Sequence, residues 1–579
     1  MKKKFYSVFA ITSVLLSVLG SSCTKYEEQP KDWFTKDLTF DNVDQNGIVA
    51  GYDLNNIYTY IPDGFARING EFLDAATDNA VPSTYNKSAE YFTRGTVTAQ
   101  NNPEESTGNG YPLTFWGDCY YGIRRVNIFL ANINAVPVAA QTKQYWITEA
   151  RFLRAYFYWE LLKRYGGVPL LGDTVYGLDD NIQLPRNTFA QTVDYIISEC
   201  NAIKPNMRPD PLSTSDFGRA SKGAAVALKC HVLLFAASPL FNGGGFESDP
   251  VKKALTGYPT ADPTRWQAVV DAYTEFQALG YYALVQTGTP TAFTSVFTTK
   301  MSTEIIFAKQ STNNNSLENN QSPVGYIVSN TKSQGLTSPT QNLVDAFPML
   351  NGLGINDVGS GYSSASPYTN RDPRLAGTVF YNGLTWLNRP TQMFEGGLDK
   401  PNNTTISTVQ SRTGYNLRKF LGNFSTSTTF SAQSHNYPIF RYAEIILNYA
   451  EALNELGQTE NAVQQVILIR KRAGITAGTN NRYGIPVGIN TSDMRTLIMN
   501  ERRIEFAFEE HRFWDIRRWK TAPQVMTQNL TGVSISAGAT PTFTPIAVTT
   551  GVWNDRLYHM PIPYDEIMKN PKLIQNEGW

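Results

Sequence analysis

The densest charged segment of the chain is ERRIEFAFEEHRFWDIRRW, residues 501–519, and we expect it to form one helix. Its carboxylates are interleaved with arginines, and they include Glu501, Glu505, Glu509 and Asp515. Two facing carboxylates can cleave a glycosidic bond when one of them has a raised pKa and acts as the acid. Here arginines flank these acids, and a neighbouring cation lowers the pKa of a carboxyl group. The pattern therefore favours a structural network of Arg–carboxylate pairs over a catalytic pair of acids.

Two polar regions carry the residue types that bind sugars. A pyranose ring stacks its apolar face on Trp or Tyr, while carboxylate, amide and guanidinium groups bind its hydroxyls. Residues 71–94 and 362–389 both mix these types within turn-forming sequence. The predicted ligand-binding residues, one of which lies between the two regions, are Asp78, Tyr85, Tyr91, Arg94, Tyr326, Tyr381 and Trp386. The aromatic content of 12% also favours recognition of flat apolar faces.

Structural roles compete with binding at several of these positions. Trp386 lies in the polar stretch NGLTWLNR, where burial in a helical core is hard to arrange, although it could anchor the loop on a neighbouring strand. Asp78 could instead cap a helix. Trp116, in the helical segment FWGDCYYGIRRVN, is expected to belong to the core.

The chain offers little material for metal or nucleophilic chemistry. Its four cysteines show no CxxC spacing, and its four histidines form no HExxH motif, so we expect neither a metal site nor a cofactor. Lys and Arg together number 50, as do Asp and Glu, so the formal net charge is zero. This balance argues against a nucleic-acid partner, because such proteins carry a basic surface.

Helical periodicity recurs in pairs along the chain, whose 579 residues exceed the size of one ordinary domain. The expected helices are 148–164, 221–237, 263–279, 440–456 and 461–473. Glycines or prolines follow several of them as stop signals. Paired antiparallel helices of this kind are what a tetratricopeptide-like stack requires. We therefore predict a mostly α fold on a tetratricopeptide-like helical repeat scaffold.

The stretch 280–437 differs from the helical parts because Gly, Pro, Ser, Thr and Asn dominate it. It predicts a large loop-rich insertion containing short strands, such as 304–307, and its aromatic residues argue against disorder. Residues 521–557 form a second polar insertion. The proline-containing stretch 559–579 is expected to cover the surface in extended form.

The first residues have the character of a targeting signal. Three lysines precede a mostly apolar stretch, and small residues then lead to Cys23, so residues 1–22 are expected to be a secretory signal peptide. The small residues before Cys23 resemble a bacterial lipoprotein box, which predicts lipidation of Cys23 and a polar tether over 23–45. Several acyl chains on one cysteine anchor a protein stably to a membrane. Cleavage nearby and free secretion is the alternative.

Several motifs, taken in order, resemble the SusD/RagB family of outer-membrane nutrient-binding lipoproteins. They are EARFLRAYFYWELLKRYGGVPL at 149–170, RASKGAAVALKCHVLLFAASPLF at 219–241, DPRL at 372–375, RYAEIILNYAEALNELG at 441–457, IRKRAGI at 469–475, RRIEFAFEEHRFWDIRRW at 502–519 and the C-terminal NPKLIQNEGW. The resemblance implies a surface-exposed, lipid-anchored protein of the cell outer membrane. It also implies a SusC-like TonB-dependent transporter as partner and glycans or other nutrients as ligands.

The resemblance suggests three regions after the tether. These are an N-terminal helical region at 46–279, the loop-rich insertion at 280–437 as the ligand-binding part, and a C-terminal helical region at 438–579. An early loop and the late insertion are expected to face one another. The function implied is binding without catalysis. A surface glycoside hydrolase and a helical-repeat adaptor that binds only proteins are the alternatives, and the ligand is not identified.

Overall fold

The computed structural model describes residues 36–105, 114–177, 179–286, 292–328, 331–402, 409–422, 424 and 431–579. The expected signal peptide and Cys23 lie outside these residues. The protein is mostly helical, with 44% helix and 11% strand, so the predicted fold class is confirmed. No helix in the described part of the chain is both long and apolar enough to cross a bilayer.

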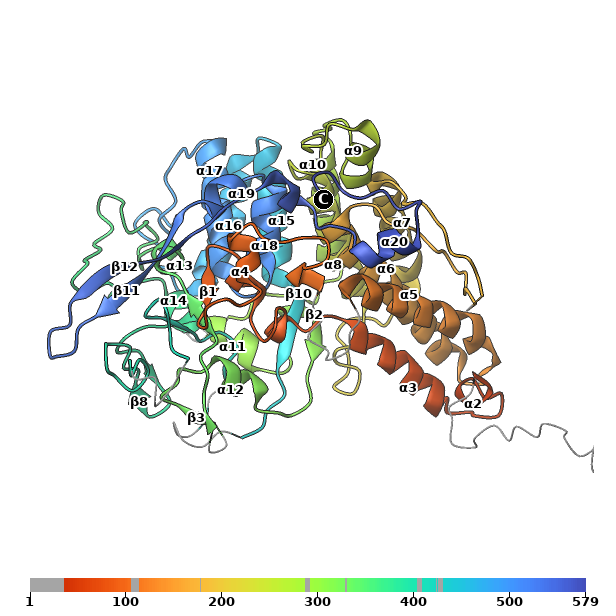
Figure 1. Cartoon of the computed structure of the whole chain (residues 1–579), viewed down its shortest axis with the longest axis horizontal. Helices are drawn as coiled ribbons and strands as arrows, with labels where there is room; N and C mark the ends of the chain where they lie inside the picture. Colours follow the sequence, from red (N-terminus) through yellow and green to blue (C-terminus); the bar gives the residue numbers. More distant parts are fainter. Residues whose placement is uncertain are drawn as a thin grey trace, which may run out of the picture.

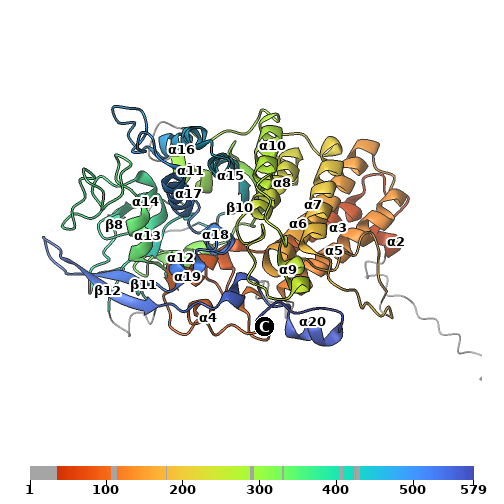
Figure 2. The same ribbon diagram turned by 90° about the horizontal axis from the view of Figure 1, so that it is seen from above.

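Long helices form a continuous series in which each packs on the next (Figure 1). They are α3 (Ile48–Ile57), α5 (Phe115–Asn132), α6 (Ala140–Tyr165), α7 (Phe189–Ile203), α8 (Lys222–Ala237), α10 (Arg265–Gln277), α15 (Tyr442–Glu455), α16 (Thr459–Ala473) and α17 (Thr491–Glu505). Figure 2 shows them side by side from α5 to α10, with α15, α16 and α17 continuing beyond. Such stacking buries one continuous core between successive helices.

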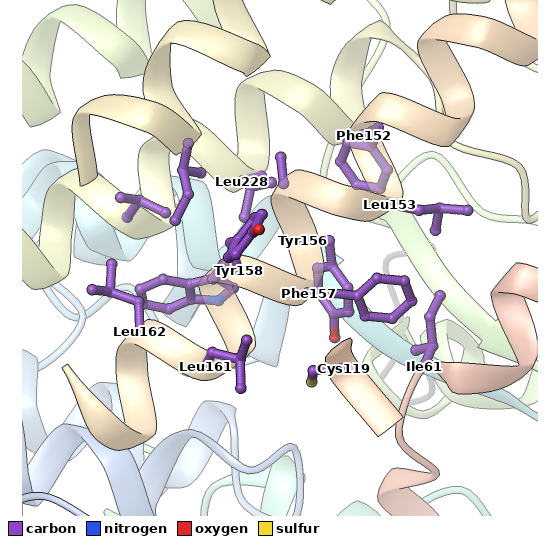
Figure 3. Close-up of a cluster of buried hydrophobic side chains, with 14 of the residues drawn as sticks. Ile61, Cys119, Phe152, Leu153, Tyr156, Phe157, Tyr158, Leu161, Leu162 and Leu228 are labelled. Atoms are coloured by element: carbon purple, nitrogen blue, oxygen red, sulfur yellow. The ribbon is translucent and has the colours of Figure 1, made fainter. Parts of the chain in front are cut away.

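Helix α6 lies at the centre of the first half of this series. Its C-terminal half is buried on all sides, and Leu153, Phe157 and Leu161 are fully enclosed. Figure 3 shows these side chains with Cys119 of α5 and Leu228 of α8 around them. The helix ends at Tyr165, and the next residue, Gly166, has a φ of 80° that suits glycine, so the expected stop signal is confirmed.

The segment expected to be one helix over 501–519 is two helices. Helix α17 ends at Glu505 and α18 spans His511–Arg518. Between them Phe508 and Glu510 adopt left-handed φ values of 65° and 63°. The backbone N–H of Phe508 donates to Asp74 Oδ1 at 3.1 Å, so a contact with the early part of the chain stabilises the break.

Short helices and two-stranded antiparallel sheets make up the remaining parts. The strand pairs are β1 (Ala80–Pro82) with β5 (Thr337–Pro339), β2 (Ile305–Gln310) with β10 (Asn436–Arg441), β3 (Ile327–Val328) with β4 (Thr331–Lys332), β6 (Val379–Phe380) with β9 (Asn416–Leu417), β7 (Thr385–Trp386) with β8 (Arg389–Pro390), and β11 (Asn529–Ile535) with β12 (Phe543–Thr550). The short helices are α2 (Lys36–Thr39), α4 (Glu90–Thr93), α9 (Pro250–Thr256), α11 (Ala292–Thr298), α12 (Ser316–Gln321), α13 (Gln341–Ala346), α14 (Pro373–Thr378), α19 (Ala522–Met526) and α20 (Tyr564–Lys569). Helix α20 interrupts the C-terminal stretch, which is therefore not extended throughout.

Candidate ligand-binding surface

The early loop and the late insertion lie side by side, as the family resemblance implies. Strand β1 pairs with β5, so that Ala80 lies opposite Pro339. Just beyond the strand, the Ser83 N–H donates to the carbonyl of Leu336 at 2.6 Å. This pairing holds the segment that follows β1 against residues from the second half of the chain.

A cluster of polar and aromatic side chains forms where the segment directly after β1 meets Arg412 from the second half of the chain. We name it the Tyr85 cluster, and its members are Tyr85, Asn86, Glu90, Arg94 and Arg412. The guanidinium of Arg412 lies 3.9 Å from the centre of the Tyr85 ring, and its Nη1 is 2.6 Å from Glu90 Oε1. Arg94 binds Glu90 Oε2 at 2.6 Å and Asn86 Oδ1 at 3.0 Å. Glu90 therefore connects both arginines.

The exposure of the cluster suits ligand binding. Tyr85 is 66% exposed, and the Arg94 side chain is 45% exposed. Arg412 is largely covered, because it packs on the tyrosine ring and donates to the carbonyl of Pro82 at 3.1 Å. The cluster thus presents an aromatic platform beside guanidinium and amide groups, which is the combination that a sugar ring requires.

Local structure fixes the loop that carries Tyr85. Asn86 has a left-handed φ of 61°, a conformation that asparagine tolerates better than most residues. The Asn86 N–H donates to Glu90 Oε2 at 2.8 Å, which ties the turn to the start of α4. Arg412 was missed by the sequence analysis. Its neighbours are ordinary loop residues, and only the tertiary fold brings it to this position.

Tyr91 does not join the exposed part of the cluster. Its side chain is partly buried and packs against the main hydrophobic core. It lies within the same short helix as Glu90, but adjacent positions of a helix point in different directions. A binding role for Tyr91 stays a prediction.

Asp78 is buried, with 2% of its surface exposed, and it does not cap a helix by any contact that the structure records. Its carboxylate accepts from Arg512 Nε at 2.8 Å and lies 2.7 Å from Arg503 Nη2. Burial opposes ionisation of Asp78, but the two arginines outweigh it and lower its pKa. Asp78 thus connects the early loop to α17 and α18, and its carboxylate is already engaged by protein cations.

Trp386 is 2% exposed and Tyr326 is fully buried, so Trp386 is buried despite its polar sequence neighbours, and the binding roles predicted for both rings stay predictions. The ring centres of these two residues are 4.8 Å apart, and Phe380 lies 5.0 Å from Trp386. The physical reason is that the β7–β8 hairpin turns the indole inward onto a local aromatic core. Trp386 therefore has the position of the loop anchor that the sequence analysis gave as the alternative. A ligand would reach the ring of Trp386 or Tyr326 only after the surrounding loops moved.

Tyr381 belongs to a third aromatic group. It stacks on Tyr368 with ring centres 4.2 Å apart, and Tyr368 in turn contacts Tyr415 and Phe543. Burial raises the pKa of Tyr381. The predicted residues of the late region thus lie in two aromatic groups of their own, and neither of them includes a member of the Tyr85 cluster.

The acids of 501–519 are paired with cations. Burial opposes ionisation of Glu505, yet Arg472, Arg441 and Arg374 hold its pKa well below the ordinary value. Glu510 is an exception to the expectation that no acid of this segment has a raised pKa. Burial raises the pKa of Glu510, because its nearest cation, Arg67, is 3.9 Å away.

Comparison with known proteins tests the resemblance to the SusD/RagB family. A family model described as "SusD family" matches residues 303–579, and one described as "Starch-binding associating with outer membrane" matches residues 31–234. A SusD-like protein from Bacteroides fragilis is 30% identical to this chain with a TM-score of 0.74, covering 92% of this chain and 98% of that one. The chain belongs to the SusD/RagB family.

Other SusD-like relatives resemble the protein over nearly its whole length. SusD-like protein P38 of Formosa agariphila is 23% identical, and the match covers 99% of each chain. A solved structure titled as a laminarin-binding SusD-like protein is 20% identical with a TM-score of 0.61, covering 92% of this chain and 99% of that one. The SusD fold therefore extends over the helical series and the loop-rich insertion alike.

Proposed function

We propose that the protein is a cell-surface lipoprotein that binds oligosaccharides and delivers them to a SusC-like TonB-dependent transporter in the outer membrane. The observation that carries the binding role is the Tyr85 cluster, in which an exposed aromatic ring lies beside two arginines. Family membership supports the role, and so does the printed title of the laminarin-binding relative. The proposed ligand-binding part combines the early loop with the insertion at 280–437.

The proposed role is binding without catalysis. A retaining glycosidase needs two carboxylates about 5–5.5 Å apart, one of them free to act as an acid. In the Tyr85 cluster the one carboxylate, that of Glu90, binds both Arg94 and Arg412. The acids of 501–519 named above as possible catalysts serve buried ion pairs. Both observations favour a binder over a glycoside hydrolase.

Attachment to the outer membrane through acyl chains on Cys23 is part of the proposal. A cysteine in this position of a lipoprotein box supports it, since several buried acyl chains anchor a protein stably. The Cys23→Ala variant should then leave the membrane fraction. If that variant remains in the membrane after a high-salt wash, an acyl anchor on Cys23 is contradicted.

A panel of neutral and acidic oligosaccharides tests the binding role. Calorimetric titration should show that the purified protein binds one class of glycan. Chromatography of the glycan after incubation with the protein should show no shortened oligosaccharides. Shortened products would support the hydrolase instead, and no binding across the panel would support the adaptor. Co-purification of a TonB-dependent barrel from detergent-solubilised membranes tests the transporter partner.

A further inference from the structure

A cavity of about 430 Å³ lies apart from the Tyr85 cluster, and no member of that cluster lines it. Its walls come from α5, from residues 169–177 and 182–184, and from α20 with the residues after it. Figure 1 shows α5 and α20 beside one another. Sites for small ligands measure about 300–1,000 Å³ and combine apolar walls with a few polar groups. The size of this cavity suits one or two sugar rings.

Aromatic side chains of α5 form one wall. The ring centres of Trp116 and Tyr120 are 5.0 Å apart, and the Tyr120 hydroxyl donates to the carbonyl of Pro169 at 2.8 Å. That bond uses the hydroxyl and fixes the ring. Tyr121 is 44% exposed and packs at 5.1 Å against Tyr60. The wall therefore offers the accessible Tyr121 beside the partly buried Tyr120 and beside Trp116, which belongs to the main core as expected.

Arg124 supplies the charge of the cavity. In the part of the chain that the structure describes it makes one hydrogen bond, from Nη1 to the carbonyl of Tyr176 at 2.7 Å, and no ion pair. A guanidinium has five N–H donors, so most of them remain for a ligand. On the facing wall Lys569 and Glu566 pair at 2.9 Å and offset each other. The lining side chains therefore carry one net positive charge.

We propose that this cavity binds a uronic acid residue. The C–H face of the pyranose would stack on Tyr121, and the carboxylate would accept hydrogen bonds from Arg124, which is a charge-assisted and geometrically specific pairing. A neutral sugar would leave the guanidinium without an anionic partner. The inference goes beyond the proposed function, because it adds a second site and names the charge of the sugar that fills it.

Calorimetric titration of the full chain with sodium D-glucuronate tests the proposal, with D-glucose as the neutral comparison. We expect saturable binding of glucuronate and at least tenfold weaker binding of glucose, since charged hydrogen bonds are worth about 1.5–3 kcal/mol. Arg124→Gln should weaken glucuronate binding about tenfold or more and bring the two sugars close together in affinity. Tyr121→Ala should weaken both.

Matched variants separate this site from the Tyr85 cluster. Arg495→Gln replaces a partly exposed residue and Tyr52→Ala an exposed one. Neither residue lines the cavity, so both variants should bind glucuronate like the parent. Tyr85→Ala should also bind glucuronate like the parent, even where it weakens binding of the oligosaccharide. Absence of saturable glucuronate binding, equal binding of glucose, or a loss caused by Tyr85→Ala and not by Arg124→Gln would each overturn the proposal. Far-UV circular dichroism confirms that each variant is folded.

Discussion

Two groups of charged side chains in this protein pair cations with carboxylates, and they differ in how completely they are buried. The first, the buried ion network, consists of Arg374, Lys419, Arg441, Arg470 and Arg472 with Glu304, Asp372, Glu501, Glu505 and Glu509. No side chain of this network is more than 6% exposed. The second group is the Tyr85 cluster, in which Tyr85 and Arg94 remain open to water.

The difference shows what burial does to an arginine–carboxylate pair. Five cations balance five anions in the network, and together they join α14, β10, α16 and α17 with Glu304, which directly precedes β2. Every charge there has a protein partner, so nothing is left for a ligand. In the Tyr85 cluster a single carboxylate is shared by two arginines, and the exposed guanidinium of Arg94 can still bind another group.

The largest expected effect follows from breaking the network at its centre. Glu505 binds Arg441 at 2.7 Å and Arg374 at 2.9 Å, and it also contacts Arg472. Glu505→Ala should lower the free energy of unfolding by about 3–5 kcal/mol, because it leaves buried cations without compensation. Urea unfolding at pH 7 measures this. An unchanged midpoint, with glycan binding lost, would mean that the network serves the ligand rather than the fold.

A second expectation separates two kinds of buried acid by their response to pH. Glu505 has a lowered pKa, so its stabilising contribution is present above its ordinary pKa and is lost as the pH falls. Glu71 is also buried, but among the described residues its carboxyl group accepts a hydrogen bond from Thr337 alone, and burial raises its pKa from 4.5 to about 8. The contribution of Glu71 is thus fully present below pH 4.5 and is lost as the pH rises through about 8.

Glu71→Gln tests this difference, because the amide resembles the protonated acid and does not titrate. The free energy of unfolding of Glu71→Gln relative to the parent should rise between pH 5 and pH 8. Urea titrations at both values give the comparison, with Glu460→Gln as a control whose carboxylate is exposed. A relative stability that stays constant across this range would contradict a neutral Glu71.

A smaller effect is expected at the surface. Tyr85→Ala removes the exposed ring but no part of a core, so the melting temperature should hardly change. Stacking of a flat ring on an aromatic side chain is worth about 1–3 kcal/mol, so oligosaccharide affinity should fall roughly tenfold. Calorimetry with the glycan found in the panel measures it, and Tyr52→Ala, also exposed, is the control. Parent-like affinity would move the site away from the cluster.

Local sequence patterns predicted most of the helical series. The expected helices 221–237 and 461–473 correspond closely to α8 and α16, because periodic apolar residues and stop signals are local features. Helix α6 begins at Ala140, earlier than the expected 148, since its first turns are polar and lack periodicity. The break after Glu505 could not be predicted, because it depends on Asp74, more than four hundred positions away in the chain.

The candidate site was predicted only in part, because some of its contacts join residues that are far apart in the sequence. Tyr85 and Arg94 were found because turn-forming neighbours indicate exposure. Arg412 was missed, since its contact with Tyr85 arises from the pairing of distant segments. Trp386 has polar neighbours too, but a two-stranded hairpin turns its ring onto Phe380 and Tyr326. Polar surroundings in the sequence therefore do not distinguish an exposed platform from a loop anchor.

The smallest expected effect concerns an arginine–glutamate pair at the surface, which can be compared directly with the buried pairs of the network. Glu460 binds Arg482 Nη1 at 2.7 Å, but the glutamate side chain is 60% exposed. Hydrogen bonds from Arg482 lower the pKa of Glu460, yet water screens the pair and competes for both partners. Glu460→Ala should therefore change the free energy of unfolding by only about 0–1 kcal/mol. Measured beside Glu505→Ala in urea, a loss as large as that of the buried glutamate would show that the number of partners, and not burial, decides the importance of these pairs.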